Sequence, residues 1–133
     1  MIATLELPLL EQGSGERNED VLLQGDGLFG VFDGATSLDK RTFADNQTGG
    51  LLAARLAATT FRENNGSLAF LADLANRRIR RSLLAENVSL SERHRLWSTS
   101  LAVVRLGDDR LEYCQTGDAQ ILLGGRALQC PHL

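Results

Sequence analysis

The stretch Gly-Leu-Phe-Gly-Val-Phe-Asp-Gly-Ala-Thr-Ser-Leu, residues 27–38, ends a short apolar run on a single carboxylate, Asp33, and a glycine turn. The run Leu28–Phe32 is aromatic and β-branched and is bounded by glycines, which predicts a buried strand. A charge at the end of a buried strand is costly unless it is paired, hydrogen-bonded or bound to a metal ion. Asp33 is therefore the first candidate functional residue.

A second acidic group, Glu19 and Asp20, lies upstream and is followed by the apolar run 21–23. The turn sequence Gly-Asp-Gly at 25–27 predicts that this run forms an antiparallel hairpin with the strand before Asp33. Antiparallel pairing brings the start of the first strand to the same end of the sheet as the end of the second. We therefore expect these acids to form a cluster.

Length and composition indicate a single globular domain. The chain has 133 residues, of which 43% are hydrophobic and 23% are charged, as is typical of soluble proteins. The net charge of −3 and the pI near 5.3 give no attraction to nucleic acid or to an anionic membrane surface. The first ten residues contain Glu6 and no basic residue, unlike a signal peptide, so we expect a cytoplasmic protein.

The remaining pattern predicts an α+β fold, with antiparallel β sheets packed against an antiparallel helix pair. A loosely alternating opening strand is expected at 4–10. Helical periodicity covers about 45–64 and resumes after Ser67, a suitable N-cap, with Asn-Asn-Gly at 64–66 suited to a left-handed helix end. A β-meander should follow, with strands at 96–106, 110–115 and 119–123 and a short return at 126–130.

Several other motifs carry no chemistry of their own. The glycines at 25–30 match a dinucleotide-binding pattern but enter a strand instead of opening a helix. The hydroxyl residues at 98–100 lack the setting of a nucleophilic serine. The arginines at 77–81 fit a solvated helix face better than a phosphate- or partner-binding patch. Cys114 and Cys130 fit buried thiols better than a disulfide or metal pair.

The acids Glu19, Asp20, Asp33 and Asp118 remain, the last of them at a second Gly-Asp turn. Clustered carboxylates bind hard cations such as Mg²⁺, Mn²⁺ or Ca²⁺, and two such ions can activate a water molecule for attack on a phosphate. Gly34 would let the backbone approach closely enough for its carbonyl to act as a ligand. Ordinary turn and capping acids are the alternative interpretation.

Four motifs, in order, resemble those of the metal-dependent protein phosphatases of type 2C. They are Arg-Asn-Glu-Asp at 17–20, Val-Phe-Asp-Gly at 31–34, Leu-Trp-Ser-Thr-Ser at 96–100 and Thr-Gly-Asp at 116–118. The predicted helix pair lies between the second and third motifs, as in the family. The resemblance implies an α-β-β-α sandwich in which two antiparallel sheets lie between helix pairs.

The resemblance also implies roles for the acids. Asp33 would bridge two Mg²⁺ or Mn²⁺ ions, Gly34 would offer its carbonyl, and Glu19 would bind one metal. Asp20 would act mainly through a metal-bound water, and Asp118 would lie near a weaker third position. A metal-bridging water would then attack the phosphoserine or phosphothreonine of a phosphoprotein substrate directly, without a phosphoenzyme.

Three departures from the family pattern affect this interpretation. Arg17, the candidate phosphate-binding residue, lies two residues before Glu19, whereas the family's arginine usually lies about four before. Ala-Thr-Ser at 35–37 replaces the usual histidine-and-glycine continuation. Residues 119–133 contain no Asp or Glu, although the family takes further aspartate ligands from its C-terminal part.

Residues 1–133 are therefore expected to form one truncated phosphatase-type domain. A sheet cut short exposes an edge, which favours a homodimer or a completing chain.

Two alternative functions stay open. A non-catalytic interaction or regulatory domain could keep the fold without the full ligand set. A haloacid-dehalogenase-type phosphatase would use Asp33 as its nucleophile, but that class needs a second Asp two residues later, where this chain has Ala35.

Overall fold

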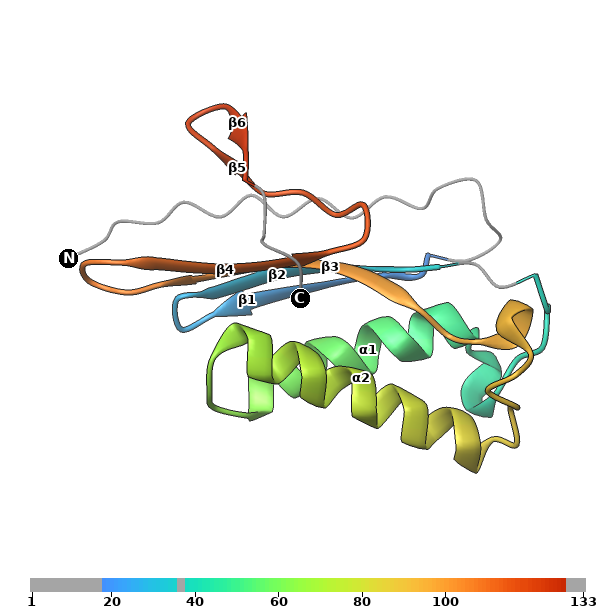
Figure 1. Ribbon diagram of the computed structural model, residues 1–133. Coiled ribbons are helices and arrows are strands. Elements are labelled where there is room, and N and C mark those ends of the chain that lie inside the picture. The colour runs from blue at the N-terminus through green and yellow to red at the C-terminus, as the bar shows by residue number, and fades with distance from the viewer. Residues whose placement is uncertain (1–17, 36–37, 129–133) are drawn as a thin grey trace.

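The computed structural model describes residues 18–35 and 38–128. Four strands form an antiparallel sheet in the order β1-β2-β3-β4, and two helices cover one of its faces (Figure 1). This arrangement confirms the predicted α+β fold. In chain order, the elements are β1 (Asp20–Gly25), β2 (Leu28–Gly34), α1 (Gly49–Glu63), α2 (Leu68–Ala85), β3 (Thr99–Leu106), β4 (Leu111–Thr116), β5 (Leu122–Leu123) and β6 (Arg126–Ala127), with short 3-10 turns at Ala44–Asn46 and Arg93–Arg95.

The predicted hairpin is confirmed. β1 and β2 pair antiparallel, with Gly25 opposite Leu28 at the turn and Asp20 opposite Asp33 at the other end. Gly27 has φ +74°, and a Cβ atom there would lie 2.9 Å from the backbone oxygen of Leu106, so both conformation and space require glycine. The turn thereby fixes the register that brings the acids to one end of the sheet.

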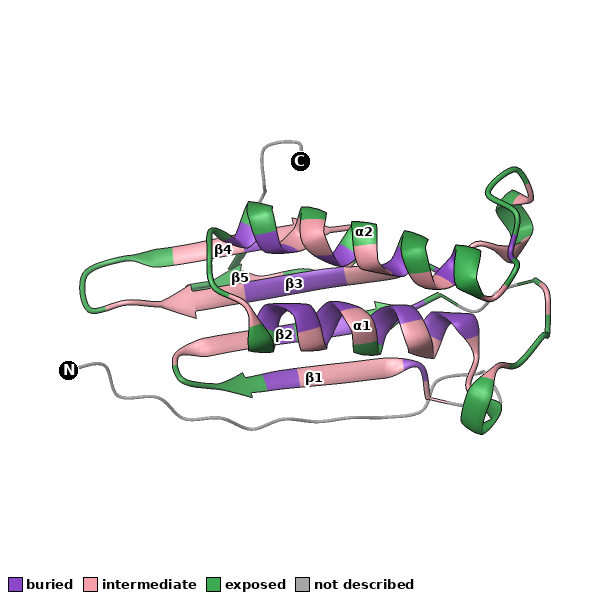
Figure 2. Ribbon diagram, turned by 90° about the horizontal axis from the view of Figure 1, so that it is seen from below, coloured by how far each residue is buried: buried purple, intermediate pink, exposed green. Residues whose placement is uncertain are grey.

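The core lies between the helices and one face of the sheet. Phe32 from β2 and Phe61 from α1 are each 1% exposed and meet with their ring centroids 5.7 Å apart. Val103 from β3 and Leu71 from α2 complete this centre, and the buried residues lie along the sides on which sheet and helices face each other (Figure 2). Each helix has one apolar side, and every second strand residue points to the same face of the sheet. The helices therefore pack as a second layer on the apolar face of the sheet.

The opposite face of the sheet corrects one prediction. The strand before Asp33 was expected to be buried throughout, but Val31 is 42% exposed while its neighbour Phe32 is 1% exposed. Successive strand residues point to opposite faces, and the helices cover only one of them. Val31 is apolar although it points outward. The sequence of this strand, which is buried on one face, therefore resembles that of a strand buried on both faces.

Both helices differ slightly from the sequence pattern. α1 begins at Gly49 and not near Asp45, because Asp45 has φ +57° within a short 3-10 turn. The N-cap is Thr48, whose hydroxyl oxygen accepts a hydrogen bond from the Leu51 N–H at 3.2 Å. Ser67 caps α2 as predicted, accepting from the Phe70 N–H at 3.1 Å. The left-handed end expected for the first helix is absent, since its C-cap Asn64 is extended.

The C-terminal strands also differ from the prediction. β3 begins at Thr99, so Trp97 precedes the strand instead of lying in it. Among the described strands, β5 and β6 pair with each other and not with the main sheet, and Leu122 is 67% exposed. The expected four-strand meander therefore ends with β4.

Three further predictions concern residues outside the described part of the chain: the strand at 4–10, Arg17 and Cys130. Cys114 is buried as expected.

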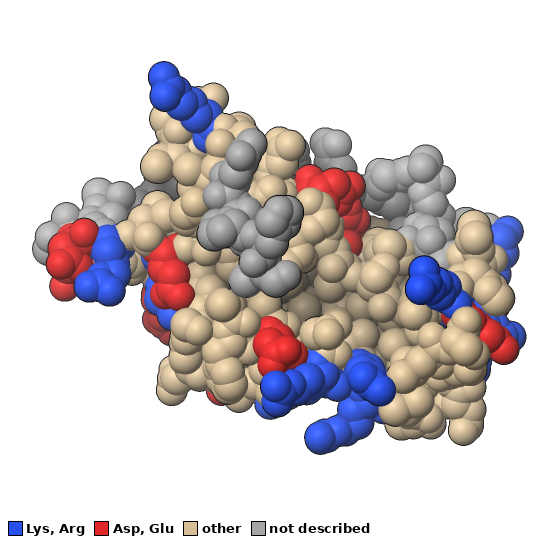
Figure 3. All heavy atoms as spheres, viewed as in Figure 1, with Lys and Arg blue, Asp and Glu red and all other residues tan. Residues whose placement is uncertain are grey.

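Arg77, Arg80 and Arg81 of α2 are exposed, whereas Arg78 is half-buried, and Figure 3 shows basic side chains on its lower side, where the helical layer lies. Arg77 pairs with Asp73 at 2.8 Å, and Arg78 lies near the Thr60 hydroxyl and the Asn64 side chain at 3.4 and 3.5 Å. These contacts agree with a solvated helix face. Within 18–35 and 38–128, neither helix is long and apolar enough to cross a membrane.

Candidate functional site

The candidate site lies where β2 ends. Asp33 is directly opposite Asp20 on β1 and Ser100 on β3, so the three side chains project from the sheet face that the helices leave uncovered. Asp33 remains exposed even though its neighbours Phe32 and Gly34 are buried. The strand alternation thus holds the carboxylate at the surface while the preceding ring anchors the strand in the core.

A pocket of about 450 Å³ surrounds Asp33, and we call it the carboxylate pocket. It brings Asp33 together with Asp118, which follows β4 and is far away in sequence. Gly117 has φ +70°, and a Cβ atom there would lie 2.5 Å from the Cβ of Ser100, so this turn packs tightly on β3. The pocket is lined by Asp33, Gly34, Ala35, Ser98, Thr99, Ser100, Gly117 and Asp118.

Partial desolvation and the neighbouring acids together raise the pKa of Asp33 above its ordinary value of 3.8. Partial burial makes the largest contribution, because it disfavours the charged form. A side-chain hydrogen bond with Asp20 and the negative charges of Asp20 and Asp118 act in the same direction. A bound cation would relieve this repulsion, so the electrostatics of the pocket favour a positively charged ligand.

The chemistry of the donors fits a hard divalent cation, because carboxylate and hydroxyl oxygens are the ligands that Mg²⁺ and Mn²⁺ prefer. Their arrangement is less complete. Among the residues that the structure describes, no three His, Cys, Asp or Glu side chains gather closely enough to hold a metal ion. The described residues thus offer donors of suitable chemistry without forming a complete metal site.

Glu19 does not join the carboxylate pocket. It precedes β1 and is only 8% exposed, and its carboxylate lies against Gly50 in the first turn of α1. Consecutive residues of an extended chain point to opposite sides, so Asp20 lies on the same sheet face as Asp33, next to but not among the described lining residues of the pocket, while Glu19 faces the helices. A carboxylate at a helix N-terminus interacts favourably with the helix dipole. Sequence proximity alone had placed both acids in one cluster.

Gly34, which lines the carboxylate pocket, is connected to Glu19 through the backbone. Its N–H donates a hydrogen bond to the backbone oxygen of Glu19 at 3.2 Å, and a Cβ atom on Gly34 would collide with the backbone oxygen of Gly50. Glycine is therefore required for the end of β2 to approach the start of α1. The backbone around Asp33 is held by both neighbouring elements.

Sequence reasoning missed the role of Ser100. Its hydroxyl oxygen is buried and has no hydrogen-bond partner among the described residues, and the residue lies opposite Asp33 in the sheet. Buried hydroxyl groups normally have a partner, so this oxygen is available to a ligand of the pocket. Only the register between β2 and β3, which the sequence does not display, identifies it.

No family model matches the chain, and no curated protein matches it. Two solved structures are similar. The catalytic domain of the serine threonine protein phosphatase PstP in complex with two manganese ions has a TM-score of 0.60 and 21% identity, over 88% of this chain and 50% of that chain. The Mycobacterium tuberculosis serine/threonine phosphatase PstP/Ppp has the same score and identity, over 89% and 49%.

The chain has the fold of half a phosphatase catalytic domain. At this identity the likeness concerns the fold alone, and the chain spans about half the length of the structures that it matches. The similarity supports the resemblance seen in the motifs as far as architecture is concerned.

Proposed function

We propose that this chain forms the metal-binding part of a protein serine/threonine phosphatase of the metal-dependent type 2C class. One observation carries the proposal: Asp33 lies between Asp20 and Asp118 at a sheet end, in a fold shared with a manganese-bound phosphatase. A metal-dependent phosphatase needs oxygen ligands at this kind of position. The proposed cofactor is Mg²⁺ or Mn²⁺, and the proposed substrate is a phosphoprotein.

The residues have separate proposed roles. Asp33 would hold the cations together with the Gly34 carbonyl, and Asp20 and Asp118 would contribute carboxylate oxygens from its two sides. When bound, two such cations supply an activated water for attack on phosphorus. Glu19, which the family pattern assigns to one metal, is proposed to hold the end of β2 in place from the helix side.

Recognition of the phosphate needs donors as well as metal ions. None of the described residues that line the carboxylate pocket is basic. The hydroxyl groups of Ser98 and Ser100 are proposed to donate hydrogen bonds to phosphate oxygens. Arg17 stays the candidate cation for the same task.

The rest of the catalytic domain is proposed to come from a further segment or chain, or from a second copy. The matched structures are about twice as long, and β1 and β4 are the edge strands of the described sheet. Unpaired strand edges offer backbone donors and acceptors to another strand. Full turnover is expected only when such a completing element is present.

The test is metal binding followed by turnover. Calorimetry with Mn²⁺ should detect binding to the chain, and Asp33→Asn should remove it, whereas Asp109→Asn at the exposed β3–β4 turn should not. With the completing element present, manganese-dependent release of phosphate from a phosphothreonine peptide should follow the same pattern. If neither Mn²⁺ nor Mg²⁺ binds in a way that depends on Asp33, the proposal is wrong.

A further inference from the structure

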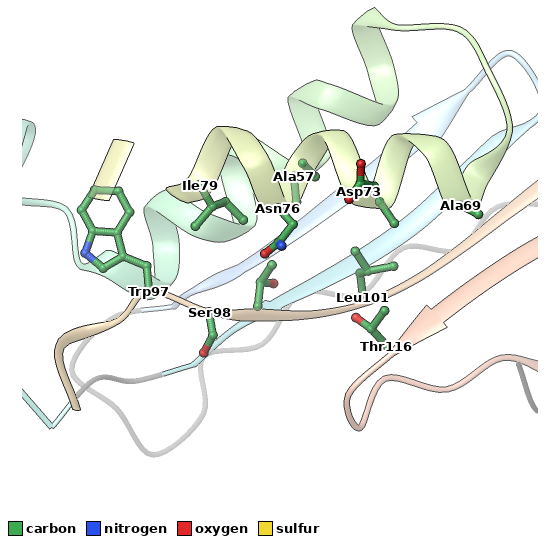
Figure 4. Close-up of a pocket in the computed structure, with 12 residues that line it drawn as sticks. Ala57, Ala69, Asp73, Asn76, Ile79, Trp97, Ser98, Leu101 and Thr116 are labelled. Atoms are coloured by element: carbon green, nitrogen blue, oxygen red, sulfur yellow. The ribbon is translucent and has the colours of Figure 1, made fainter. Parts of the chain in front are cut away.

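A second pocket, of about 480 Å³, opens between α2 and the sheet, and we call it the α2 groove. It lies beside the start of β3 and the end of β4, and Figure 4 shows α2 passing above Ser98, Leu101 and Thr116. Ala69, Ala72 and Ala75 are the small residues that α2 contributes to its lining. Because these side chains are short, α2 leaves space above the strands there.

The lining of the α2 groove is apolar inside and polar at its rim. Leu101 and Ile79 are buried and give an apolar surface, whereas Asn76 is exposed and points from α2 toward the strand near Ser98 (Figure 4). Asp73 also lines the groove, and its carboxylate pairs with Arg77 at 2.8 Å on the exposed side of α2. Pockets of this size, apolar with a few hydrogen-bonding groups, are typical of ligand sites.

The α2 groove and the carboxylate pocket lie next to each other at the start of β3 and share two lining residues. Ser98 and Thr99 line both, because the start of β3 separates the helix side of the sheet from the side that carries Asp33. A ligand with its phosphate at Asp33 would therefore have its adjoining part next to the groove. The amide of Asn76 could hydrogen-bond the backbone of such a ligand.

We propose that the α2 groove binds an apolar side chain of a peptide, at the residue adjacent to the one whose phosphate occupies the carboxylate pocket. The phosphate part of this proposal rests on the proposed function. The occupant is apolar because the charged residue of the described lining, Asp73, is exposed at the rim, and burial of a Leu or Phe side chain against Leu101 and Ile79 is favourable.

Trp97 provides a direct readout of occupancy. It is the single tryptophan of the chain, it is 6% exposed, and it lines the α2 groove. Its fluorescence should therefore respond when a side chain enters the groove, whether or not any phosphate is released. Binding can thus be measured separately from turnover.

The experiment titrates the full chain with Mn²⁺ and phosphothreonine hexapeptides that carry Gly, Leu or Phe next to the phosphothreonine, before it in one series and after it in another. Trp97 fluorescence should change, and in one series the Leu and Phe peptides should bind about tenfold more tightly than the Gly peptide. Asn76→Phe, which adds a ring in the groove, should remove this preference. Ala85→Phe, at an exposed position of the same helix outside the groove, should keep it.

The outcomes separate this proposal from the proposed function. If peptides bind but Leu, Phe and Gly are equivalent in both series, or if no peptide changes the Trp97 signal, the groove proposal is overturned, whatever the metal data show. If the preference persists in unphosphorylated peptides and in Asp33→Asn while no metal-dependent binding is found, the groove stands and the phosphatase proposal falls. If Asn76→Phe still bound the Leu and Phe peptides more tightly than the Gly peptide, the apolar side chain would bind outside the α2 groove, and the groove proposal would be overturned.

Discussion

Asp20 and Asp33 are directly paired across β1 and β2, with both side chains on the sheet face opposite the helices. The pairing places two carboxylates side by side, and Asp118 approaches from the turn after β4. Burial together with these neighbours raises the pKa of Asp33. The site therefore holds a negative charge that the folded protein disfavours in the absence of a cation.

Asp33→Asn should stabilise the metal-free protein at neutral pH. The folded pKa of Asp33 is raised, so the folded state binds the proton more tightly than the unfolded state does. Its contribution to stability is thus favourable below the ordinary pKa and is lost as pH rises through the raised value. Urea unfolding in EDTA should give a higher midpoint for Asp33→Asn at neutral pH, with the difference disappearing by about pH 4.

Asp109→Asn is the matched control, because Asp109 lies in an exposed turn and pairs only loosely with Arg110 at 3.8 Å. It should leave the midpoint nearly unchanged across the same pH range. Equal behaviour of the two variants would contradict the electrostatic account of the site.

Added Mn²⁺ should reverse the order of stability. A ligand that binds only the folded state stabilises it by RT ln(1 + [L]/Kd), or about 2.7 kcal/mol at a concentration one hundred times Kd. The wild type should therefore gain thermal stability with Mn²⁺ and lose it again with EDTA, whereas Asp33→Asn should not respond. Equal gains for the two proteins would mean that the metal binds away from Asp33.

Local sequence signals predicted the parts of the fold that depend on neighbouring residues. The Gly-Asp-Gly turn fixed the β1–β2 hairpin and thereby the alignment of Asp20 with Asp33. Ser67 marked the start of α2 because a hydroxyl group can accept from the free N–H groups of a helix. Errors at the helix starts and strand ends came from single residues such as Asp45, whose positive φ no periodicity displays.

The site was predicted less completely, since it depends on tertiary geometry. Glu19 and Asp20 are adjacent in sequence but face opposite sides, and only the position of α1 shows that the glutamate is buried. Ser100 gains its importance from the β2–β3 register. The α2 groove depends on how far the helix lies from the strands, which the alanine spacing does not reveal.

Glu112 joins the β3–β4 hairpin to the helix layer, and its removal should destabilise the fold. One of its carboxylate oxygens accepts a hydrogen bond from the Leu68 N–H at 2.8 Å, at the start of α2, and the other pairs with Arg105 at 3.0 Å. Arg105 also donates to the Gly66 backbone oxygen at 2.9 Å. Glu112→Ala should cost about 1–2 kcal/mol in the free energy of unfolding, mainly by leaving the helix N–H unsatisfied.

Glu112→Gln separates the two contributions of this residue. The amide oxygen can still accept from Leu68, whereas the ion pair with the partly exposed Arg105 is lost. Partly exposed ion pairs contribute little, so this variant should lose less than about 1 kcal/mol. A loss equal to that of Glu112→Ala would show that the charge, and not the hydrogen bond, ties the hairpin to α2.

Gly50→Ala should destabilise the protein, against the usual effect of this change in a helix. Replacing a helical glycine by alanine normally stabilises by about 1 kcal/mol. At Gly50, however, a Cβ atom would overlap the Glu19 carboxylate and lie 2.5 Å from the backbone oxygen of Ala35. Forcing these groups apart should cost about 1–3 kcal/mol in urea unfolding, as overpacking does elsewhere.

Gly107→Ala provides the comparison for that substitution. Its added Cβ atom would meet the Arg110 backbone oxygen at 3.4 Å, which is ordinary van der Waals contact, so the unfolding free energy should change by less than about 0.5 kcal/mol. Gly50→Ala should also disturb the end of β2, since Gly34 packs on the backbone of Gly50. Mn²⁺ affinity at Asp33 should therefore fall in Gly50→Ala and stay unchanged in Gly107→Ala. A stabilised Gly50→Ala with normal metal affinity would rule out the close contact between α1 and Glu19.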